Sequence, residues 1–242
     1  MVSLIKVHDI SAGYGKLQVL TEVSMEANPG EITVIVGPNG SGKSTLLKTI
    51  TGLTNIYHGT VALDGKQLSG LAPHEIARLG VAYLPQTEST FTELKVMENF
   101  KMAAYTVRKE DFEPRLKSAF DIFPQLKDYE KSKVADLSGG ERQMVAMTMA
   151  LLRKPLVIMF DEPTANLSPK YATQVLKTIQ TLAKDRGLTI VLVEQNARRA
   201  LEIGDHAYLL VGGKNAFRGP AKDLLSHQEL AKLYLGVKVT SS

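Results

Sequence analysis

The chain of 242 residues contains no cysteine. Disulfides and thiolate-bound metal ions are therefore excluded, and the composition fits a protein of the cytosol. The most extended apolar runs, Leu156 to Phe160 and Leu188 to Val193, have the length of buried strands. Both fall far short of the roughly 18–20 residues that cross a bilayer. The N-terminal residues lack the basic start and apolar core of a signal peptide. We therefore expect any role at a membrane to depend on a partner.

Neither sign of charge dominates. The net charge is +4, and Lys and Arg are interspersed with Asp and Glu along the chain. This pattern favours solvated faces over a nucleic-acid-binding patch. Hydrophobic residues make up 44% and charged residues 22%, which is ordinary for a soluble protein with a full-sized core. Repeats, coiled-coil heptads and low-complexity segments are missing, so we expect one globular domain over residues 1–242, with a subdomain.

Strand and helix patterns alternate through much of the chain. Short apolar runs predict early strands at Leu4–Val7, Val19–Met25, Glu31–Val36, Thr60–Leu63 and Val81–Leu84. The later strands and the helices between them are predicted at Gly140–Arg153, Leu156–Phe160, Pro169–Lys184 and Thr189–Val193. This alternation indicates βαβ units, and hence an α/β fold with a mainly parallel sheet and helices on both faces.

The pattern changes between about residues 87 and 136. Strand signals vanish there, and apolar residues recur at helical spacing, as in Leu94, Met97 and Phe100. We interpret this segment as a mostly helical subdomain inserted into the α/β core. From about Asp205 the chain predicts short strands and then amphipathic helices that end near Leu235.

A glycine-rich loop follows the third predicted strand and begins a helix from Lys43 to Ile50. It matches the phosphate-binding pattern G-x-x-x-x-G-K-[ST] over Gly37, Pro38, Asn39, Gly40, Ser41, Gly42, Lys43 and Ser44. Its glycines let backbone N–H groups surround phosphate oxygens, and the helix N-terminus adds partial positive charge. We expect Lys43 to reach the β- and γ-phosphates, Ser44 to place its hydroxyl on Mg²⁺, and Thr45 to help hold the α-phosphate.

The apolar strand that begins at Leu156 ends in two carboxylates, Asp161 and Glu162. Ligands gather at the carboxyl ends of strands in open parallel sheets, so this pair is expected beside the phosphate loop. Asp161 is the candidate for holding Mg²⁺, and Glu162 is the candidate general base that activates the attacking water. A solvated turn after a strand is the alternative.

A second possible anion site lies shortly before this strand, at Leu137-Ser138-Gly139-Gly140-Glu141-Arg142-Gln143. Ser138 is placed to cap a helix, and the two glycines bare backbone N–H groups. Because one phosphate loop is already present, a second cradle suggests a composite site across a dimer. An ordinary capping box, Ser followed three residues later by Glu, is the alternative.

With these motifs in this order, the chain resembles the ABC (ATP-binding cassette) ATPase family from about Ile5 to Leu235. The resemblance implies a P-loop NTPase core with an N-terminal antiparallel β subdomain and an inserted helical subdomain. It also implies that Tyr14 stacks on adenine and that Gln86 senses Mg²⁺ and the γ-phosphate. Residues Ser138 to Gln143 match the signature segment, which in the family contacts ATP held by the opposite protomer.

Two positions depart from the general family pattern. Ser168 stands where most members have the aspartate of the D-loop, and Gln195 stands where most have the switch histidine. A glutamine cannot accept a proton, so we expect Gln195 to orient the γ-phosphate and water while Glu162 acts as the base. The Val-Glu-Gln-Asn segment that contains Gln195 resembles one of the two ATP-binding subunits of branched-chain amino-acid importers; related importers of urea and other amino acids share it.

The resemblance therefore implies an ATPase that uses ATP and Mg²⁺ to energise import of a small solute, such as branched-chain or other amino acids. Its implied partners are transmembrane permease subunits, a second ATPase subunit and, indirectly, an extracytoplasmic solute-binding protein, with the chain on the cytoplasmic face of the membrane. We expect Phe91 and Leu94 to contact the permease if they are exposed, and to belong to the subdomain core if they are not. The alternative functions are an ATP-dependent clamp with little hydrolysis, and a cassette that acts on nucleic acid.

Overall fold

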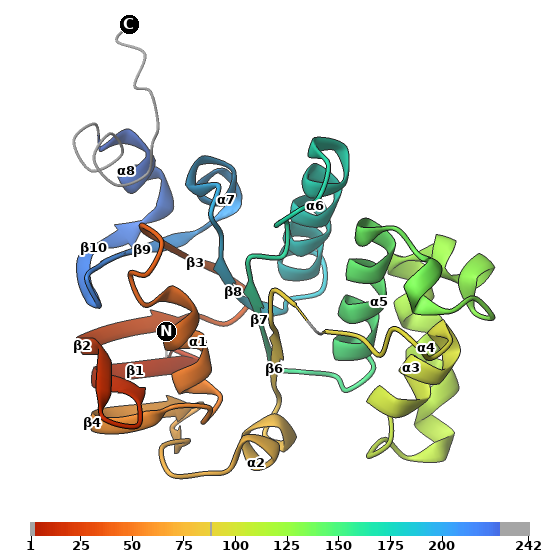
Figure 1. Ribbon diagram of the computed structural model, residues 1–242, viewed down its shortest axis with the longest axis horizontal. Helices are drawn as coiled ribbons and strands as arrows, with labels where there is room; N and C mark the ends of the chain where they lie inside the picture. Colours follow the sequence, from red (N-terminus) through yellow and green to blue (C-terminus); the bar gives the residue numbers. More distant parts are fainter. Residues whose placement is uncertain (1–2, 88, 228–242) are drawn as a thin grey trace, which may run out of the picture.

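The structure is a computed structural model that describes residues 3–87 and 89–227 (Figure 1). Its strands are β1 (Ile5–Tyr14), β2 (Leu17–Ala27), β3 (Ile32–Val36), β4 (Asn55–Leu63), β5 (Lys66–Gln67), β6 (Val81–Leu84), β7 (Val157–Asp161), β8 (Thr189–Val193), β9 (His206–Val211) and β10 (Lys214–Pro220). Its α-helices are α1 (Lys43–Ile50), α2 (Pro73–Arg78), α3 (Val96–Ala103), α4 (Lys109–Ile122), α5 (Gly139–Leu151), α6 (Pro169–Lys184), α7 (Ala197–Ile203) and α8 (Ala221–Ser226). Two 3₁₀ helices, η1 (Pro124–Tyr129) and η2 (Val134–Asp136), precede α5.

The central sheet has the strand order β10-β9-β3-β8-β7-β6. All neighbours from β9 to β6 are parallel, and only β10 is antiparallel, in a hairpin with β9. Strands β3, β7 and β8 are buried at every position, which explains why they consist of apolar runs without alternation. The mainly parallel sheet predicted from the sequence is therefore confirmed.

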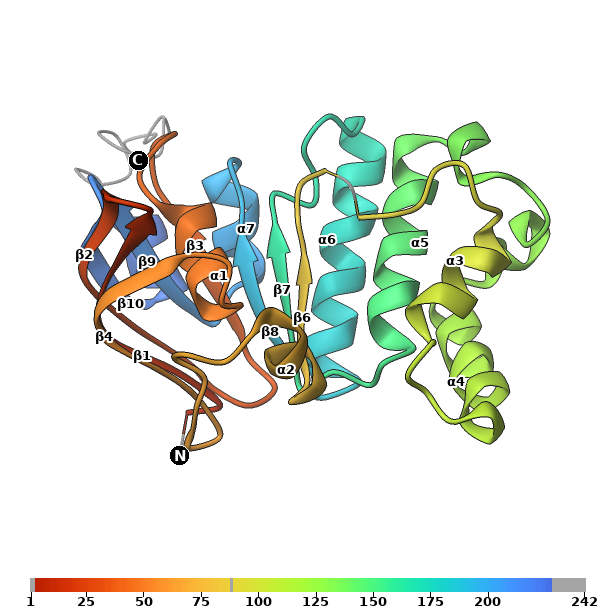
Figure 2. The same cartoon turned by 60° about the horizontal axis from the view of Figure 1, so that its bottom comes forward.

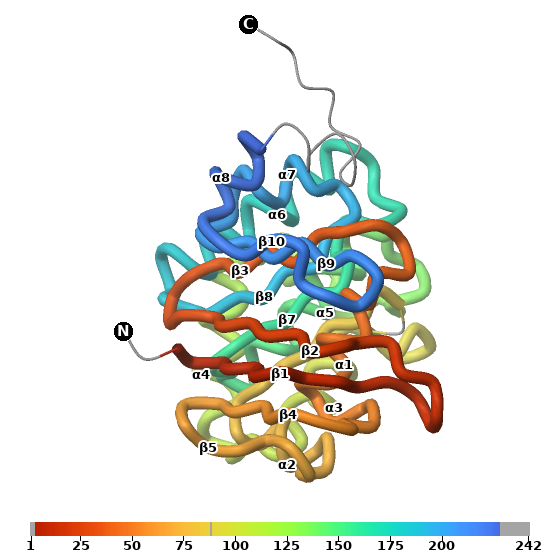
Figure 3. The backbone as a smooth tube through the Cα atoms, turned by 90° about the vertical axis from the view of Figure 1, so that its left-hand side faces the viewer, coloured from red at the N-terminus to blue at the C-terminus, as the bar shows by residue number. Residues whose placement is uncertain are grey.

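Different elements cover the two faces of this sheet. On one face Val34, Ile158 and Leu192 pack with the apolar sides of α5, α6 and α7. On the other face Ile35 and Val191 pack with α1 and with a four-stranded antiparallel sheet of order β2-β1-β4-β5. Figure 3 shows this second sheet from its outer side. Helices therefore pack on both faces, as predicted. On the α1 face the antiparallel sheet packs as well.

The predicted boundaries agree best where apolar periodicity is strong. Helices α1 and α6 and strands β6 and β8 span the predicted residues, whereas β1 and β2 are longer than predicted and meet at a turn at Gly15 and Lys16. The short helices α2 and α7 were not predicted. The predicted end of the last helix near Leu235 lies outside the described residues. Among the residues described, no helix has the length and apolarity needed to span a bilayer.

The segment between β6 and α5 contains α3, α4 and both 3₁₀ helices, and it lies beyond α5 at one end of the molecule (Figure 2). A fully buried amide, Asn99 on α3, holds the loop that leads into this segment. Its Oδ1 accepts a hydrogen bond from the Phe91 N–H at 2.8 Å, and its Nδ2 donates to the Phe91 carbonyl at 2.9 Å and to the Lys95 carbonyl at 3.0 Å. The backbone around Phe91 is therefore fixed from within.

We predict that Asn99→Ala lowers the free energy of unfolding by about 1–3 kcal/mol, the range for leaving buried backbone groups without partners. Urea denaturation followed by circular dichroism measures the loss. Lys101→Ala on the exposed side of the same helix is the matched control. Equal stability of both variants and the wild type would contradict the role of Asn99.

Candidate nucleotide-binding and hydrolysis site

The phosphate loop connects β3 to α1 and depends on glycine at two positions. Gly37 has φ +150°, and a Cβ there would lie 2.1 Å from the Leu210 carbonyl oxygen. Gly42, the N-cap of α1, has φ +99° in the left-handed region. The glycines of the motif therefore permit both the path of the chain and the close approach of β9.

Lys43 is buried and lies back across this loop. Its Nζ donates to the Gly37 carbonyl at 3.0 Å and to the Pro38 carbonyl at 2.9 Å. Burial lowers its pKa, and the negative charges of Glu162 and Asp161 oppose that effect. The ammonium group is therefore placed between the loop and the two carboxylates at the end of β7.

Two further observations fit the loop to a phosphate group. The Ser41 hydroxyl is buried and has no hydrogen-bond partner among the residues that the structure describes. Asn39 and Gly40 are exposed at the tip of the loop, where their backbone can reach a ligand. Thr45 is buried in the first turn of α1. A buried hydroxyl without a partner is costly, and a phosphate oxygen would supply one.

The Asp161 carboxylate is the point at which three elements meet. It is 4% exposed, and its Oδ1 accepts a hydrogen bond from the Ser44 hydroxyl at 2.8 Å. Its Oδ2 accepts one from the Tyr83 hydroxyl at 2.9 Å. Sequence analysis missed Tyr83. Burial, followed by the charge of Asp161, raises the pKa of Tyr83 well above its usual range, so this phenol remains a donor.

Glu162 follows Asp161 directly and has a left-handed backbone, with φ +51°. Its Oε2 accepts a hydrogen bond from Gln86 Nε2 at 3.2 Å. Gln86 comes just after β6, so this contact connects the carboxyl ends of β6 and β7. The structure thus brings together Gln86, Glu162, Asp161, Ser44 and Lys43, as expected from the sequence.

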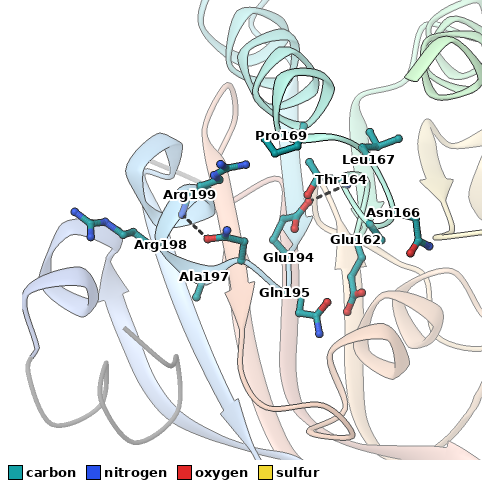
Figure 4. A pocket seen from close by; sticks show the side chains of 13 residues that line it. Glu162, Thr164, Asn166, Leu167, Pro169, Glu194, Gln195, Ala197, Arg198 and Arg199 are labelled. Carbon is teal, nitrogen blue, oxygen red and sulfur yellow. Dashed lines mark hydrogen bonds between the residues drawn. The ribbon is translucent and has the colours of Figure 1, made fainter. Parts of the chain in front are cut away.

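Gln195 is exposed just beyond the carboxyl end of β8, where it lies on the same side of the sheet as Glu162 (Figure 4). Both residues line a cavity of about 680 Å³ between the segment after β7 and the start of α7. Glu194, which directly precedes Gln195, is 3% exposed and accepts a hydrogen bond from the Thr164 N–H at 3.1 Å. Sequence analysis did not single out Glu194.

Tyr14 lies at the end of β1 and is 42% exposed. It is close enough to Tyr83 to contribute to the raised pKa of that residue. The turn after it is held from β4, because the Asn55 Oδ1 accepts from the Gly15 N–H at 3.1 Å and the Tyr57 hydroxyl donates to the Gly15 carbonyl at 2.9 Å. The ring is thus available to a flat ligand.

The signature segment, Ser138 to Gln143, lies at the start of α5 and not at the ends of the parallel strands. Ser138 caps α5 by accepting from the Glu141 N–H at 3.3 Å, and Glu141 Oε2 accepts from the Ser138 N–H at 2.7 Å. The capping box that was the alternative to an anion site therefore forms. A Cβ on Gly140 would lie 2.5 Å from the Tyr171 ring on α6, so close helix packing also requires glycine there. Strands β6–β8 and helix α6 lie between α1 and α5 (Figure 2). Gly139 lines a cavity of about 390 Å³ together with Gln86 and Glu162.

A glycine loop between a buried strand and a helix, with an acidic strand end bonded to the serine of that loop, defines a P-loop nucleotide-binding protein. The family described as "ABC transporter" matches residues 20–165. This chain belongs to that family, as an ATP-binding subunit and an ATPase.

Three curated relatives are similar to this chain over nearly its whole length. It is 52% identical to the probable branched-chain amino acid transport ATP-binding protein LivF of Archaeoglobus fulgidus, over 94% of this chain and 97% of that protein. It is 37% identical to the high-affinity branched-chain amino acid transport ATP-binding protein BraG of Pseudomonas aeruginosa, over 94% and 97%. It is 31% identical to the lipopolysaccharide export system ATP-binding protein LptB of Haemophilus influenzae, over 97% and 98%.

Solved structures agree on the fold. An ATP-binding cassette of an ABC transporter in its ADP conformation matches with a TM-score of 0.86 at 26% identity, over 96% of this chain and 98% of that one. A dimeric cassette in a post-hydrolysis state, bound to ADP and phosphate, matches with a TM-score of 0.78 at 25% identity, over 90% and 98%. The predicted fold class, a P-loop core with an antiparallel β subdomain and an inserted helical segment, is confirmed.

Burial of Glu194 generates a prediction about pH. Burial raises its pKa above the ordinary value of 4.5, and the charge of Glu162 adds to this, while hydrogen bonds from Thr164 and Gln195 act in the opposite direction. Below pH 4.5 the group is protonated in both the folded and the unfolded chain. As pH rises through the folded-state pKa, ionisation of the buried group removes stability. Glu194→Gln cannot ionise, so its stability relative to wild type should increase from about pH 4.5 to pH 8.

Thermal unfolding of the nucleotide-free protein across that pH range measures the difference. Glu202→Gln, which changes an exposed carboxylate on α7, is the control and should track the wild type. A constant difference between Glu194→Gln and wild type at all pH values would contradict a raised pKa.

Proposed function

We propose that this chain is the ATP-hydrolysing subunit of a transporter that imports branched-chain or other small amino acids. Hydrolysis is supported by one geometric observation: hydrogen bonds connect the phosphate-loop Ser44 to Asp161 and connect Gln86 to Glu162, at neighbouring strand ends. The cargo is supported by the names of relatives at 52% and 37% identity, which are amino acid transport proteins; the relative named for export is less similar, at 31% identity.

In this proposal the phosphate loop holds the triphosphate. Lys43 exchanges its bonds with the loop carbonyls for bonds with the β- and γ-phosphates, and backbone N–H groups of residues 39–45 surround the phosphate oxygens. The exposed Tyr14 ring stacks on the adenine base. Glu162 accepts a proton from the attacking water, and Gln195 orients that water and the γ-phosphate.

The residues around Asp161 fit a magnesium ion. The Ser44 hydroxyl, the Asp161 carboxylate and the Gln86 side-chain carbonyl are hard oxygen donors, the type that Mg²⁺ prefers. The described residues contain no group of three or more His, Asp or Glu side chains that could hold a metal alone, so phosphate oxygens would complete the set. When bound, the ion neutralises charge that develops on the phosphates.

A second ATPase subunit, either another copy or a sister chain, completes the site. Ser138, Gly139 and Gly140 are at the start of α5, and α5 is separated from α1 by β6–β8 and α6 (Figure 2). Across a pair of chains they can supply N–H groups and the N-terminus of α5 to the partner's γ-phosphate. A structural neighbour solved as a dimer with ADP and phosphate supports this arrangement.

The permease contact is proposed at a groove of about 360 Å³ between α2, β6, α3 and α5, which includes Leu53, Ile76 and Met149. At its edge Leu53 is 49% exposed, and Phe91 in the nearby loop is 50% exposed. Leu94 is partly buried, so of the two expected contact residues Phe91 is the better candidate. Docking there, with the solute-binding protein acting on the permease from outside, would place the chain at the cytoplasmic face of the membrane.

We predict that Lys43→Ala weakens MgATP binding and abolishes turnover, whereas Glu162→Gln keeps binding and lowers turnover by about 10²–10⁴-fold. The first change removes the phosphate contact, and the second removes the base but keeps its shape. Equilibrium nucleotide binding and single-turnover hydrolysis distinguish the two.

Glu162→Gln should also dimerise with ATP, because hydrolysis is blocked. Size exclusion with MgATP at low salt tests this, alone and after mixing with a candidate sister subunit. Wild-type binding and turnover in Lys43→Ala would refute the proposed site. Tight ATP binding without measurable wild-type turnover would favour the clamp function instead.

We predict that Phe91→Ser uncouples transport from hydrolysis. Removal of an exposed ring should leave ATP affinity and stability unchanged but abolish most of the permease-dependent stimulation of turnover. Reconstituted amino-acid uptake and ATPase rates measure this. Leu156→Ser, which changes an equally exposed side chain just before the amino end of β7, is the control. Normal uptake by Phe91→Ser would exclude this surface.

A further inference from the structure

The backbone of the candidate base is strained. Glu162 has φ +51°, and Asn166 four residues later has φ +61°, both in the left-handed region. For residues other than glycine such conformations cost about 1–3 kcal/mol each and persist only where the surroundings enforce them. We call residues 162–168, which connect β7 to α6, the Glu162 loop. Something must hold this loop in its strained form.

Two hydrogen bonds connect the Glu162 loop to the end of β8. The Glu162 N–H donates to the Val193 carbonyl at 2.9 Å, and the Thr164 N–H donates to the Glu194 carboxylate at 3.1 Å. Strand register explains their proximity, because Asp161 pairs with Val193 in the parallel ladder. The other side of the loop faces the cavity of about 680 Å³ (Figure 4). Packing from that side is therefore weak, and hydrogen bonds restrain the loop: the two from the end of β8, and the one from Gln86 to the Glu162 carboxylate.

The Glu194 side chain is unusual for its position. It is 3% exposed and directly follows β8, whose five residues are all buried. Burying a carboxylate is costly unless it is well bonded, and an apolar residue would fit such a strand end more easily. The proposed reaction gives Glu194 no contact with the nucleotide. Figure 4 shows its carboxylate directed toward Thr164, away from the Gln195 side chain.

We propose that Glu194 is a positioning residue that holds the Glu162 loop through the Thr164 N–H, so that the Glu162 carboxylate stays aimed at the attacking water. Because Glu194 directly precedes Gln195, the same bond fixes the spacing between the base and the residue that orients the water. Glu194 therefore couples the ends of β7 and β8 into one unit. This inference rests on the proposed function, in which Glu162 is the base.

The test uses two substitutions of similar length. Glu194→Gln keeps an oxygen that can accept from the Thr164 N–H, whereas Glu194→Met has none. Single-turnover hydrolysis by the full chain should be about 10–100-fold slower in Glu194→Met, the range for slight misplacement of a catalytic group. Glu194→Gln should stay near the wild-type rate. Affinity for ATP should be unchanged in both, and Glu202→Ala on α7 is the control. If Glu194→Met does not fold, Glu194→Ala replaces it with the same expected result.

The double variant Glu162→Gln/Glu194→Met shows whether Glu194 acts through Glu162. Without the base, loss of the Thr164 bond should cause no further slowing, so the double variant should match Glu162→Gln. Multiplicative losses, or equal slowing by Glu194→Gln and Glu194→Met, would overturn the proposal. So would a wild-type rate in Glu194→Met. Failure of the proposed function looks different, because Glu162→Gln alone would then hydrolyse ATP at the wild-type rate.

Discussion

The Asp161 carboxylate holds the site together. It ends a strand buried on both faces, and its two oxygens bond the first turn of α1 through Ser44 and the neighbouring strand β6 through Tyr83. The phosphate loop ends at Ser44, and the Glu162 loop begins directly after Asp161. Because parallel strands end at one edge, a single buried carboxylate can set the distance between the residues that bind phosphate and those that act on water.

Positive and negative side chains lie close together at the carboxyl ends of the parallel strands. Lys43 is a buried cation, and the negative charges of Glu162 and Asp161 act on it; Asp161 and Glu194 are carboxylates that are almost fully buried. Burial disfavours every one of these charges, and mutual attraction or hydrogen bonds offset the cost. A triphosphate would add negative charge beside the carboxylates, so the site accommodates it best with a cation. This requirement agrees with the oxygen donors that converge on Asp161.

Much of the fold could be predicted from the sequence because its strongest signals are local. The apolar runs of β3, β7 and β8 and the periodicity of α6 indicate their structure without reference to distant residues. The phosphate loop, Asp161 and Glu162 carry motifs. Tyr83 and Glu194 could not be found in this way, since their roles depend on strand register: Tyr83 bonds a residue 78 positions away, and Glu194 one 30 positions away. The left-handed backbone of Glu162 is likewise set by tertiary bonds.

Gly140 shows how a mutational result at this site can be misread. Its missing side chain lets the Tyr171 ring of α6 approach, and in the proposed dimer its N–H would also belong to the anion site at the start of α5. Any side chain introduced there shifts the two helices as well as hindering a ligand, so loss of activity would not establish contact with nucleotide. Replacing the Gly140 amide by an ester would remove the N–H donor and leave the helix packing intact, which separates the two causes at a single atom.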